Sequence, residues 1–298
     1  MSARELLVGV HTAALKAVHA GTAVERALVA IDSPQVYTVL GAGKAACAMA
    51  RSAVQFLGSG VVGGLVVTKD EHSFPLPGLE VIEASHPIPD ARSVDAAERA
   101  LQLARGLGDA DVLLALISGG ASALWCAPAP GLTLQEKRDV TRQLLSAGAE
   151  ISEINAVRKH LSRIKGGGLL EAALPARVLT LAVSDVAGDR SDHIGSGPTV
   201  PDPTSFADAL AVLRDRGVEE SVPEAVRRHL ERGEAGECAE TLKPGAVPDD
   251  RFEFRVVAAL GDALEAARAE ADSRGQRTRL LGPILYGEAR ELARSLAV

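Results

Sequence analysis

A glycine-rich loop that contains a lysine is the first segment of the chain whose residues could do chemistry. Residues 41–46, GAGKAA, follow a short apolar run and match the G-x-G-x-x-A variant of the dinucleotide-binding fingerprint. Glycines at these positions let backbone amides approach an anion at the start of a helix. A lysine in a first helical turn opposes the helix dipole, so Lys44 indicates an anion bound nearby. The alternative is a tight strand-to-helix turn. The loop is not a Walker A motif, because Ala45 stands where that motif requires Ser or Thr.

Two further segments carry groups that suit anions and protons. Residues 118–122, SGGAS, follow an apolar run, and their hydroxyls and glycine amides could bind a phosphate or a carboxylate. A tight turn accounts for the same residues equally well. His86 stands in the segment SHPIPD, in which two prolines restrict the backbone. Its imidazole is either a base or an ordinary loop side chain.

An acidic loop follows the apolar run that ends near residue 183. Asp185, Asp189 and Asp192 lie close together in the sequence, and neighbouring carboxylates repel one another unless a cation neutralises them. Mg²⁺ commonly binds one or two carboxylates together with phosphate oxygens, so we predict Asp185 and Asp189 as its ligands. The adjoining segment GSGPT, which contains Ser196, favours this interpretation over a solvated acidic turn.

A helix with a cationic face is predicted over residues 151–165, because apolar side chains recur there at helical spacing. Three consecutive glycines, 166–168, then end the helix. One polar sector of this helix carries the side chains of Asn155, Arg158, Lys159, Ser162 and Lys165. A solvated basic face is the alternative, but a plain helix end needs only one glycine.

These segments together favour phosphoryl transfer, in which positioning and charge neutralisation supply most of the catalysis. The chain offers a lysine in an anion-binding loop, a glycine–serine loop, a cationic helix and an acidic loop. No Ser-His-Asp spacing, zinc-ligand cluster or Schiff-base motif in the sequence suggests a competing chemistry.

Strands that alternate with helices must position these segments. Apolar runs predict strands over residues 36–40, 61–68, 79–84, 111–117 and 177–183, with amphipathic helices between them. This alternation predicts an α/β fold: a Rossmann-like three-layer parallel sheet with helices on both faces. The glycine-rich and acidic loops come directly after strands, and ligands bind at that edge of such sheets.

The C-terminal part is expected to form an incomplete second domain. We predict a first domain over residues 1–245, followed over residues 246–298 by a linker and the start of a second α/β domain. Its expected strands are 255–260 and 278–282, and its expected helices are 262–274 and 287–297. Two strands make a sheet that is marginal by itself.

The composition excludes several classes of protein. The 298 residues carry a net charge of −7, which gives no general basic surface for nucleic acid. Three widely spaced cysteines form neither a metal-binding pattern nor a disulfide framework. No apolar run reaches the length of about 18 residues that a membrane helix needs, and the N-terminus lacks the layout of a signal peptide. We therefore expect a cytoplasmic protein that binds neither nucleic acid nor membranes.

The motifs of the chain, in their order, are similar to those of the glycerate 2-kinase family, whose members carry a DUF4147 N-terminal domain and a MOFRL C-terminal domain. They are GAGKAA at 41–46, SHPIPD at 85–90, SGGASAL at 118–124, INAVRKHLSRIKGGGL at 154–169, SDVAGD at 184–189 and GSGPT at 195–199. The resemblance covers residues 1–240 and implies phosphorylation of D-glycerate to 2-phosphoglycerate, with ATP and Mg²⁺ as cofactors.

The resemblance also implies roles for residues that match the motifs. Lys44 would be the catalytic lysine, and Asp189 would act with it by ordering the phosphates. Asp185 and Asp189 would hold Mg²⁺. The residues expected to bind substrate or phosphate are Gly41, Gly43, His86, Ser118, Gly119, Gly120, Ser122, Asn155, Arg158, Lys159 and Ser196.

The chain departs from the family pattern at its C-terminus, where the MOFRL domain is missing. We therefore expect a truncated chain that forms a homo-oligomer or works with a separately encoded C-terminal domain. Two other functions stay open. One is an NAD(P)-dependent hydroxypyruvate reductase, favoured by the G-x-G-x-x-A loop and by the name that some family members carry. The other is a non-catalytic remnant that binds an anion or a partner.

Overall fold

The computed structural model describes residues 2–31, 35–281 and 288–297 of the chain. The chain forms two compact units, of which one comprises residues 20–258 and the other combines residues 1–19 with 259–298. All the predicted site residues lie in the larger unit.

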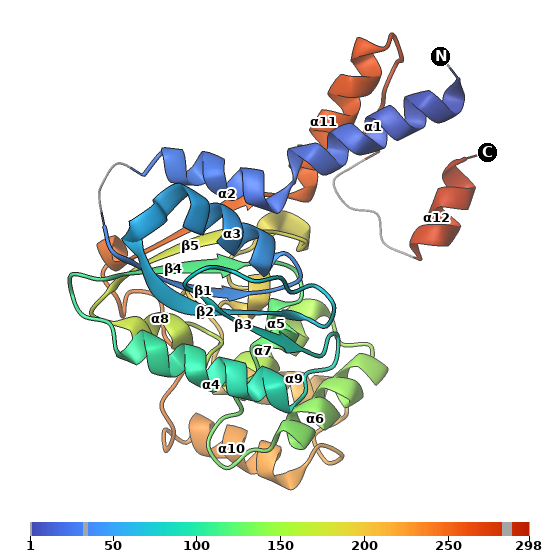
Figure 1. Ribbon diagram of the computed structural model, residues 1–298. Helices are drawn as coiled ribbons and strands as arrows, with labels where there is room; N and C mark the ends of the chain where they lie inside the picture. Colours follow the sequence, from blue (N-terminus) through green and yellow to red (C-terminus); the bar gives the residue numbers. More distant parts are fainter. Residues whose placement is uncertain (1, 32–34, 282–287, 298) are drawn as a thin grey trace. The chain divides into compact units, whose positions relative to one another are not determined.

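A parallel sheet of six strands forms the centre of the larger unit (Figure 1). Its strands are β1 (Tyr37–Ala42), β2 (Val61–Lys69), β3 (Glu80–Ala84), β4 (Val112–Ile117), β5 (Arg177–Val183) and β6 (Phe252–Ala258). They pair in the order β3-β2-β1-β4-β5-β6, and every pair is parallel. The predicted α/β sheet is thereby confirmed. Because the strand order reverses between β1 and β4, the switch point at which such folds bind ligands lies between these two strands.

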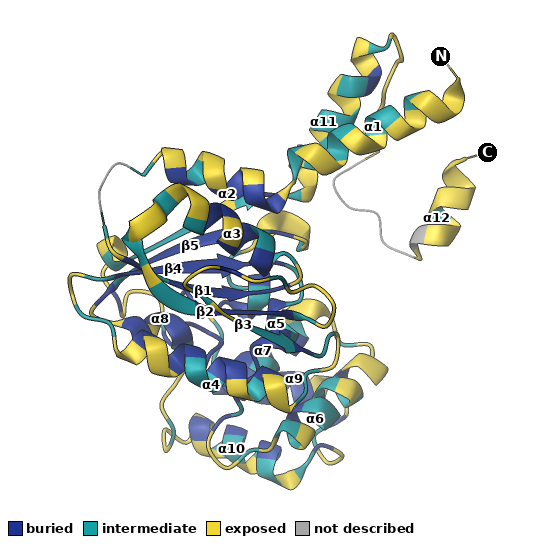
Figure 2. Cartoon of the chain, viewed as in Figure 1, coloured by how far each residue is buried: buried dark blue, intermediate teal, exposed yellow. Residues whose placement is uncertain are grey.

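Helices cover both faces of the sheet, because successive side chains of its strands point to opposite sides. In β4, Leu114 and Leu116 pack with α2 (Ala20–Val29) and α3 (Ala46–Leu57). Leu113 and Ile117 of the same strand pack with the opposite layer. That layer consists of α4 (Ala91–Arg105), α5 (Ala121–Leu124) and α8 (Gly168–Ala173). Figure 2 shows the central strands buried and the outer faces of the covering helices exposed.

A helical layer with its own apolar cluster completes the larger unit (Figure 1). It consists of α6 (Leu134–Ser146), α7 (Ile151–His160), α9 (Phe206–Asp215) and α10 (Glu224–Glu234). Thr133 starts α6 by accepting a hydrogen bond from the amide of Glu136, whose carboxylate in turn accepts one from the Thr133 amide. This layer sets the position of α7, which carries three of the predicted site residues.

The predicted helix over residues 151–165 is shorter in the structure, because α7 ends at His160. Beyond it the backbone amides turn to other partners: the Arg163 amide donates to the Ala127 carbonyl oxygen at 3.0 Å. Gly166 and Gly167 adopt φ values of 55° and 83°, and the segment leads into α8. The prediction that Ser162 and Lys165 share one helical sector with Asn155 was therefore wrong.

The division of the chain differs from the predicted domains 1–245 and 246–298. Strand β6 pairs with β5 and completes the sheet, so the larger unit extends to Ala258. The smaller unit contains α1 (Ala3–Ala17), which packs on α11 (Leu260–Ser273), and α12 (Ala289–Leu296). The expected strand over 278–282 does not form at residues 278–281, and residue 282 lies outside the described residues. None of the helices in the described part of the chain has the length and apolar character that crossing a bilayer requires.

Candidate active site

The loops after β1 and β4 interlock at the switch point. The backbone amide of Lys44 donates to the Gly119 carbonyl oxygen at 2.9 Å, and that of Ala45 donates to Ser118 Oγ at 3.0 Å. Gly43 has a φ of 132°, and a Cβ atom there would overlap Ser118. Only glycine therefore allows the two loops to approach this closely.

The loops after β1, β3, β4 and β5 bring a lysine, a histidine, two glycines and a carboxylate together. Lys44 Nζ lies 4.0 Å from Asp185 Oδ2, and the two side chains are 44% and 62% exposed. A Cβ atom on Gly119 would overlap that carboxylate oxygen. A Cβ atom on Gly120 would lie 2.9 Å from His86 Cδ2 and 3.5 Å from Lys44 Cγ. The predicted grouping of Lys44, His86, the glycine–serine loop and Asp185 is thus what the structure contains.

The His86 imidazole is kept neutral by its surroundings. Partial burial lowers the pKa of His86, and the positive charges of Lys44 and Lys69 lower it further, against a smaller opposing effect of Asp185. A neutral imidazole can accept a proton, so His86 is chemically suited to act as a base at this site.

The amides of the glycine-rich loop are used within the protein, which contradicts their predicted role in binding an anion. The Gly43 amide donates to the Val67 carbonyl at 3.2 Å, the Lys44 and Ala45 amides donate to the β4 loop, and the Ala46 amide donates to the Gly43 carbonyl. Gly41 is buried inside β1, where it pairs with Val66 of β2. Lys44 also precedes α3 instead of lying in its first turn. The loop therefore positions the Lys44 side chain.

Several of the predicted binding residues form one hydrogen-bonded group beside this site. Ser122 Oγ lies 2.9 Å from Ser196 Oγ, and the Ser196 hydroxyl donates to Asn155 Oδ1 at 3.2 Å. The amine of Lys165 donates to the carbonyl oxygen and the hydroxyl of Ser122, at 2.7 and 3.0 Å. Lys165 was not among the predicted binding residues, since the sequence indicated only its place near the end of a helix.

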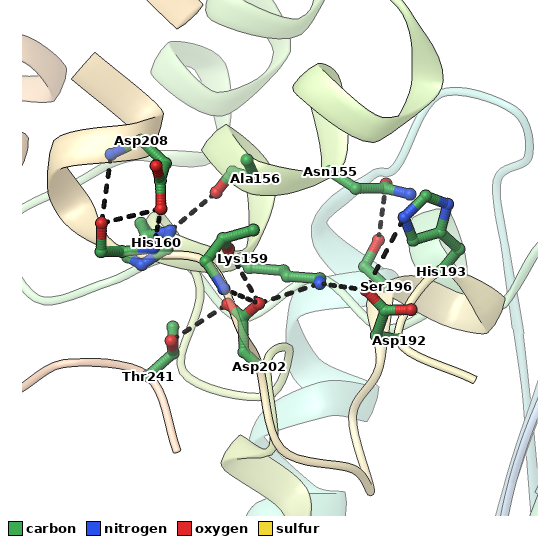
Figure 3. Close-up of polar contacts among 12 residues, drawn as sticks. Asn155, Ala156, Lys159, His160, Asp192, His193, Ser196, Asp202, Asp208 and Thr241 are labelled. Atoms are coloured by element: carbon green, nitrogen blue, oxygen red, sulfur yellow. Dashed lines mark hydrogen bonds and ion pairs between the residues drawn. The ribbon is translucent and has the colours of Figure 1, made fainter. Parts of the chain in front are cut away.

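Lys159 is turned away from this group into a buried ion pair (Figure 3). Its amine lies 3.0 Å from Asp202 Oδ1 and 3.4 Å from Asp192 Oδ2, and the Lys159 and Asp202 side chains are 2% and 0% exposed. Although burial opposes it, the Lys159 charge and hydrogen bonds from Thr204 lower the pKa of Asp202. The amine is engaged in holding the fold, so the structure does not bring Lys159 to the predicted cationic face.

The carboxylates of the acidic loop are not gathered at one point. Asp192 is bound by Lys159 and by Arg190, whose Nη2 lies 2.9 Å from Asp192 Oδ2. Asp189 is exposed, with a φ of 52°, in the short 3₁₀ turn Ala187–Asp189. The described residues contain no group of three or more His, Cys, Asp or Glu side chains that could hold a metal ion. Of the three carboxylates of this loop, that of Asp185 is the one with an ion pair to Lys44.

A cavity of about 410 Å³ opens beside His86 and Gly120 and runs between the β4 loop, α6 and α7. Arg158, predicted to face the cleft, lines it together with Ser122. Lys137 and Lys165 also line it, and neither was predicted. Lys137 gave no signal in the sequence, because a lysine in a polar helix is ordinarily solvated.

Comparison with known proteins identifies the family of the chain. Residues 6–231 match a protein family described as a domain of unknown function, DUF4147. The chain belongs to this family. The resemblance found in the motifs is thereby confirmed for this part of the chain.

Relatives of this DUF4147 chain carry two different names. A putative hydroxypyruvate reductase of Agrobacterium vitis is 48% identical over 87% of the chain and 57% of its own length. A D-glycerate 2-kinase of Thermotoga maritima is 37% identical over 99% of the chain and 68% of its own length. A crystal structure of a glycerate kinase from Thermotoga maritima superposes with a TM-score of 0.86 at 35% identity, covering 98% of the chain and 68% of that structure. The DUF4147 chain thus spans between 57% and 68% of the length of these relatives.

Proposed function

We propose that this chain acts as a glycerate 2-kinase, which transfers the γ-phosphoryl group of ATP to the 2-hydroxyl of D-glycerate. The observation that carries the proposal is the position of the Lys44 amine. It is half exposed at the switch point of the sheet, 4.0 Å from its acidic neighbour Asp185 and next to His86. The relatives named as glycerate kinases support the same reaction.

The site residues divide the work of the reaction. The new bond forms between the substrate oxygen and the γ-phosphorus, and the bond from that phosphorus to ADP breaks. The Lys44 amine stabilises the negative charge on the transferring group, because a preorganised charge is worth far more there than in water. The neutral His86 imidazole accepts the proton of the attacking hydroxyl.

Asp185, with Asp189 on the same loop, would hold Mg²⁺ with the nucleotide phosphates. The exposed carboxylate of Asp185 beside Lys44 fits a cation that takes one or two protein carboxylates. When bound, Mg²⁺ neutralises phosphate charge. Lys44 and Asp185 would hold the phosphates at the edge of the sheet where the loops after β1, β4 and β5 meet.

The reductase reading is favoured by the names of relatives but is opposed by the geometry. The amides of the fingerprint loop donate within the protein, so they are not available to a dinucleotide pyrophosphate. Asp70, the acidic residue after β2, is bound by the Arg92 guanidinium at 2.6 and 3.0 Å. A ribose-binding carboxylate would have to leave that ion pair.

The proposal is tested by glycerate-dependent release of ADP from the chain in the presence of MgATP. Lys44→Met should lower the turnover number by about 10²-fold or more, as removal of a preorganised charge does. Lys16→Met, at an exposed position of α1, is the matched control and should retain the wild-type rate. A wild-type rate in Lys44→Met, or oxidation of NADH with hydroxypyruvate in place of ADP release, would contradict the proposal.

We also propose that the smaller unit packs on another protein surface, either a second copy of the chain or a separately encoded domain. Leu7, Leu260 and Leu281 in this unit are 66%, 55% and 55% exposed, and large exposed apolar surfaces mark sites of association. Light scattering over a range of chain concentrations distinguishes self-association from a chain that needs a different partner.

A further inference from the structure

The cavity beside the active site has a strongly cationic inner wall. Lys137, Arg158 and Lys165 line it, and the rim adds Arg138 and Arg142. The described residues that line this cavity include no Asp or Glu. Its positive charge is therefore not balanced by carboxylates of the cavity itself.

The hydrogen-bond partners of the two lysines on the inner wall are uncharged oxygen atoms. The amine of Lys137 donates to the Leu161 carbonyl oxygen at 2.6 Å, and that of Lys165 donates to Ser122. Among the residues that the structure describes, Arg158 has neither a hydrogen bond nor an ion pair. A guanidinium has five N–H donors in a planar fork, and a charged group that is largely buried is costly unless it is paired.

Burial and the repulsion between these cations lower the pKa values of the two lysines. Burial lowers the pKa of Lys137 to about 8, and Arg158 contributes to that shift. Burial also lowers the pKa of Lys165 well below its ordinary value, and repulsion from Lys137 and Arg158 adds to it. An anion in the cavity would remove this penalty by stabilising the charged forms.

The cavity leads to the reacting groups. His86 and Gly120 also line it, and a Cβ atom on Gly120 would be in contact with both His86 and Lys44. A small molecule held at the inner wall therefore extends toward the place where the lysine and the imidazole meet.

We propose that this cavity is the subsite for the carboxylate of the substrate, that Arg158 binds this carboxylate with its guanidinium fork, and that Lys165 provides a second positive charge held in place by Ser122. The proposal deepens the proposed function, on which it relies for the identity of the reaction. It assigns the substrate as a hydroxy acid whose carboxylate lies at Arg158 and whose hydroxyl lies toward His86. Lys137 is a positioning residue that fixes the loop after α7 through Leu161.

The test is a binding measurement that needs no phosphoryl transfer. D-glycerate is titrated into the full chain without nucleotide, by isothermal titration calorimetry, with glycerol as the probe that lacks the carboxylate. Arg158→Gln should weaken glycerate binding by roughly tenfold or more, as expected for loss of a charge-assisted pair. Arg228→Gln, which removes an exposed arginine of α10, is the matched control and should leave the affinity unchanged.

Folding of the variants is checked by the fluorescence of Trp125, the single tryptophan of the chain. Arg158→Gln should unfold at the wild-type urea concentration or above it, because its guanidinium has no partner among the described residues. Arg158→Lys keeps the charge without the fork and should bind glycerate with intermediate affinity, which keeps the proposal testable if the glutamine variant fails to fold.

The outcomes separate this proposal from the proposed function. Unchanged glycerate affinity in the Arg158 variants, binding of glycerol as strong as that of glycerate, or no binding of glycerate to the wild-type chain would each overturn the carboxylate subsite. If Arg158→Gln weakens glycerate binding while no ADP release is found with the wild type, the subsite stands and the kinase proposal fails. If ADP release depends on Lys44 but glycerate affinity does not depend on Arg158, the kinase proposal stands and the subsite fails.

Discussion

Removal of the Lys159 amine tests whether this side chain holds the fold or serves the cleft. In the structure the amine contacts Asp202 at 3.0 Å and Asp192 at 3.4 Å, and Asp202 is entirely buried. Lys159→Met keeps the length and much of the apolar surface of the side chain while removing its charge. It leaves the Asp202 carboxylate buried without its cation.

The expected cost follows from the contacts that remain. Breaking a buried ion pair by removing one partner costs about 3–5 kcal/mol. Asp202 keeps hydrogen bonds from the Thr204 amide at 3.0 Å, the Thr204 hydroxyl at 2.8 Å and the Thr241 hydroxyl at 3.0 Å. These donors continue to stabilise the carboxylate, so we expect the free energy of unfolding to fall by about 3 kcal/mol, the lower end of that range. The double variant Lys159→Met/Asp202→Asn removes both charges and should regain more than half of the loss.

Urea unfolding followed by Trp125 fluorescence measures this effect in the larger unit, where Trp125 is buried. The reasoning is refuted if Lys159→Met costs less than about 1 kcal/mol, the value of an exposed pair. It is also refuted if the double variant is no more stable than the single one. If Lys159→Met folds normally but no longer binds glycerate, Lys159 serves substrate binding, as predicted from the sequence.

Two other substitutions test the site and its buried charges. Gly119→Ala would put a Cβ atom onto Asp185 Oδ2. Because this carboxylate is exposed and can move aside, we expect the free energy of unfolding to change by under about 1 kcal/mol, while the turnover number falls clearly. An unchanged rate at saturating Mg²⁺ would show that Asp185 takes no part in the reaction. Burial lowers the pKa of Lys137 to about 8 from 10.5, so the unfolded chain binds more protons between these pH values and the wild type should gain stability over Lys137→Met as the pH rises through this window. The gain should approach about 3 kcal/mol, and urea midpoints of the two proteins that move in parallel from pH 7.5 to pH 10.5 would contradict it.

The architecture and the edge at which the site lies were predictable from the sequence, because both depend on local patterns. Buried strands between amphipathic helices indicate a parallel sheet with helices on both faces, and the loops after those strands must then meet at one edge. Lys44, His86 and Asp185 each follow a strand, so their meeting there required no knowledge of side-chain contacts.

The limits of the larger unit were not predictable in the same way. Strand β6 belongs to the sheet through its pairing with β5, which lies about seventy residues earlier in the chain. A strand pattern indicates that a segment is extended and apolar, but it does not name the strand beside it. For the same reason, the end of α7 at His160 depends on the contact of Arg163 with Ala127.

The sequence by itself determined the fold class, the edge that carries the site and the residues at the strand ends, since these follow from the periodicity of apolar side chains. Only the tertiary structure decided the use of the charges on the helices. Arg158 and Lys159 are neighbours on α7 and were predicted to share one role, yet Lys159 is buried against Asp202 while Arg158 lines the cavity. Lys137 and Lys165 join Arg158 there from other segments. Helical periodicity sets the direction in which a side chain points, whereas the residue that it contacts there comes from a distant part of the chain.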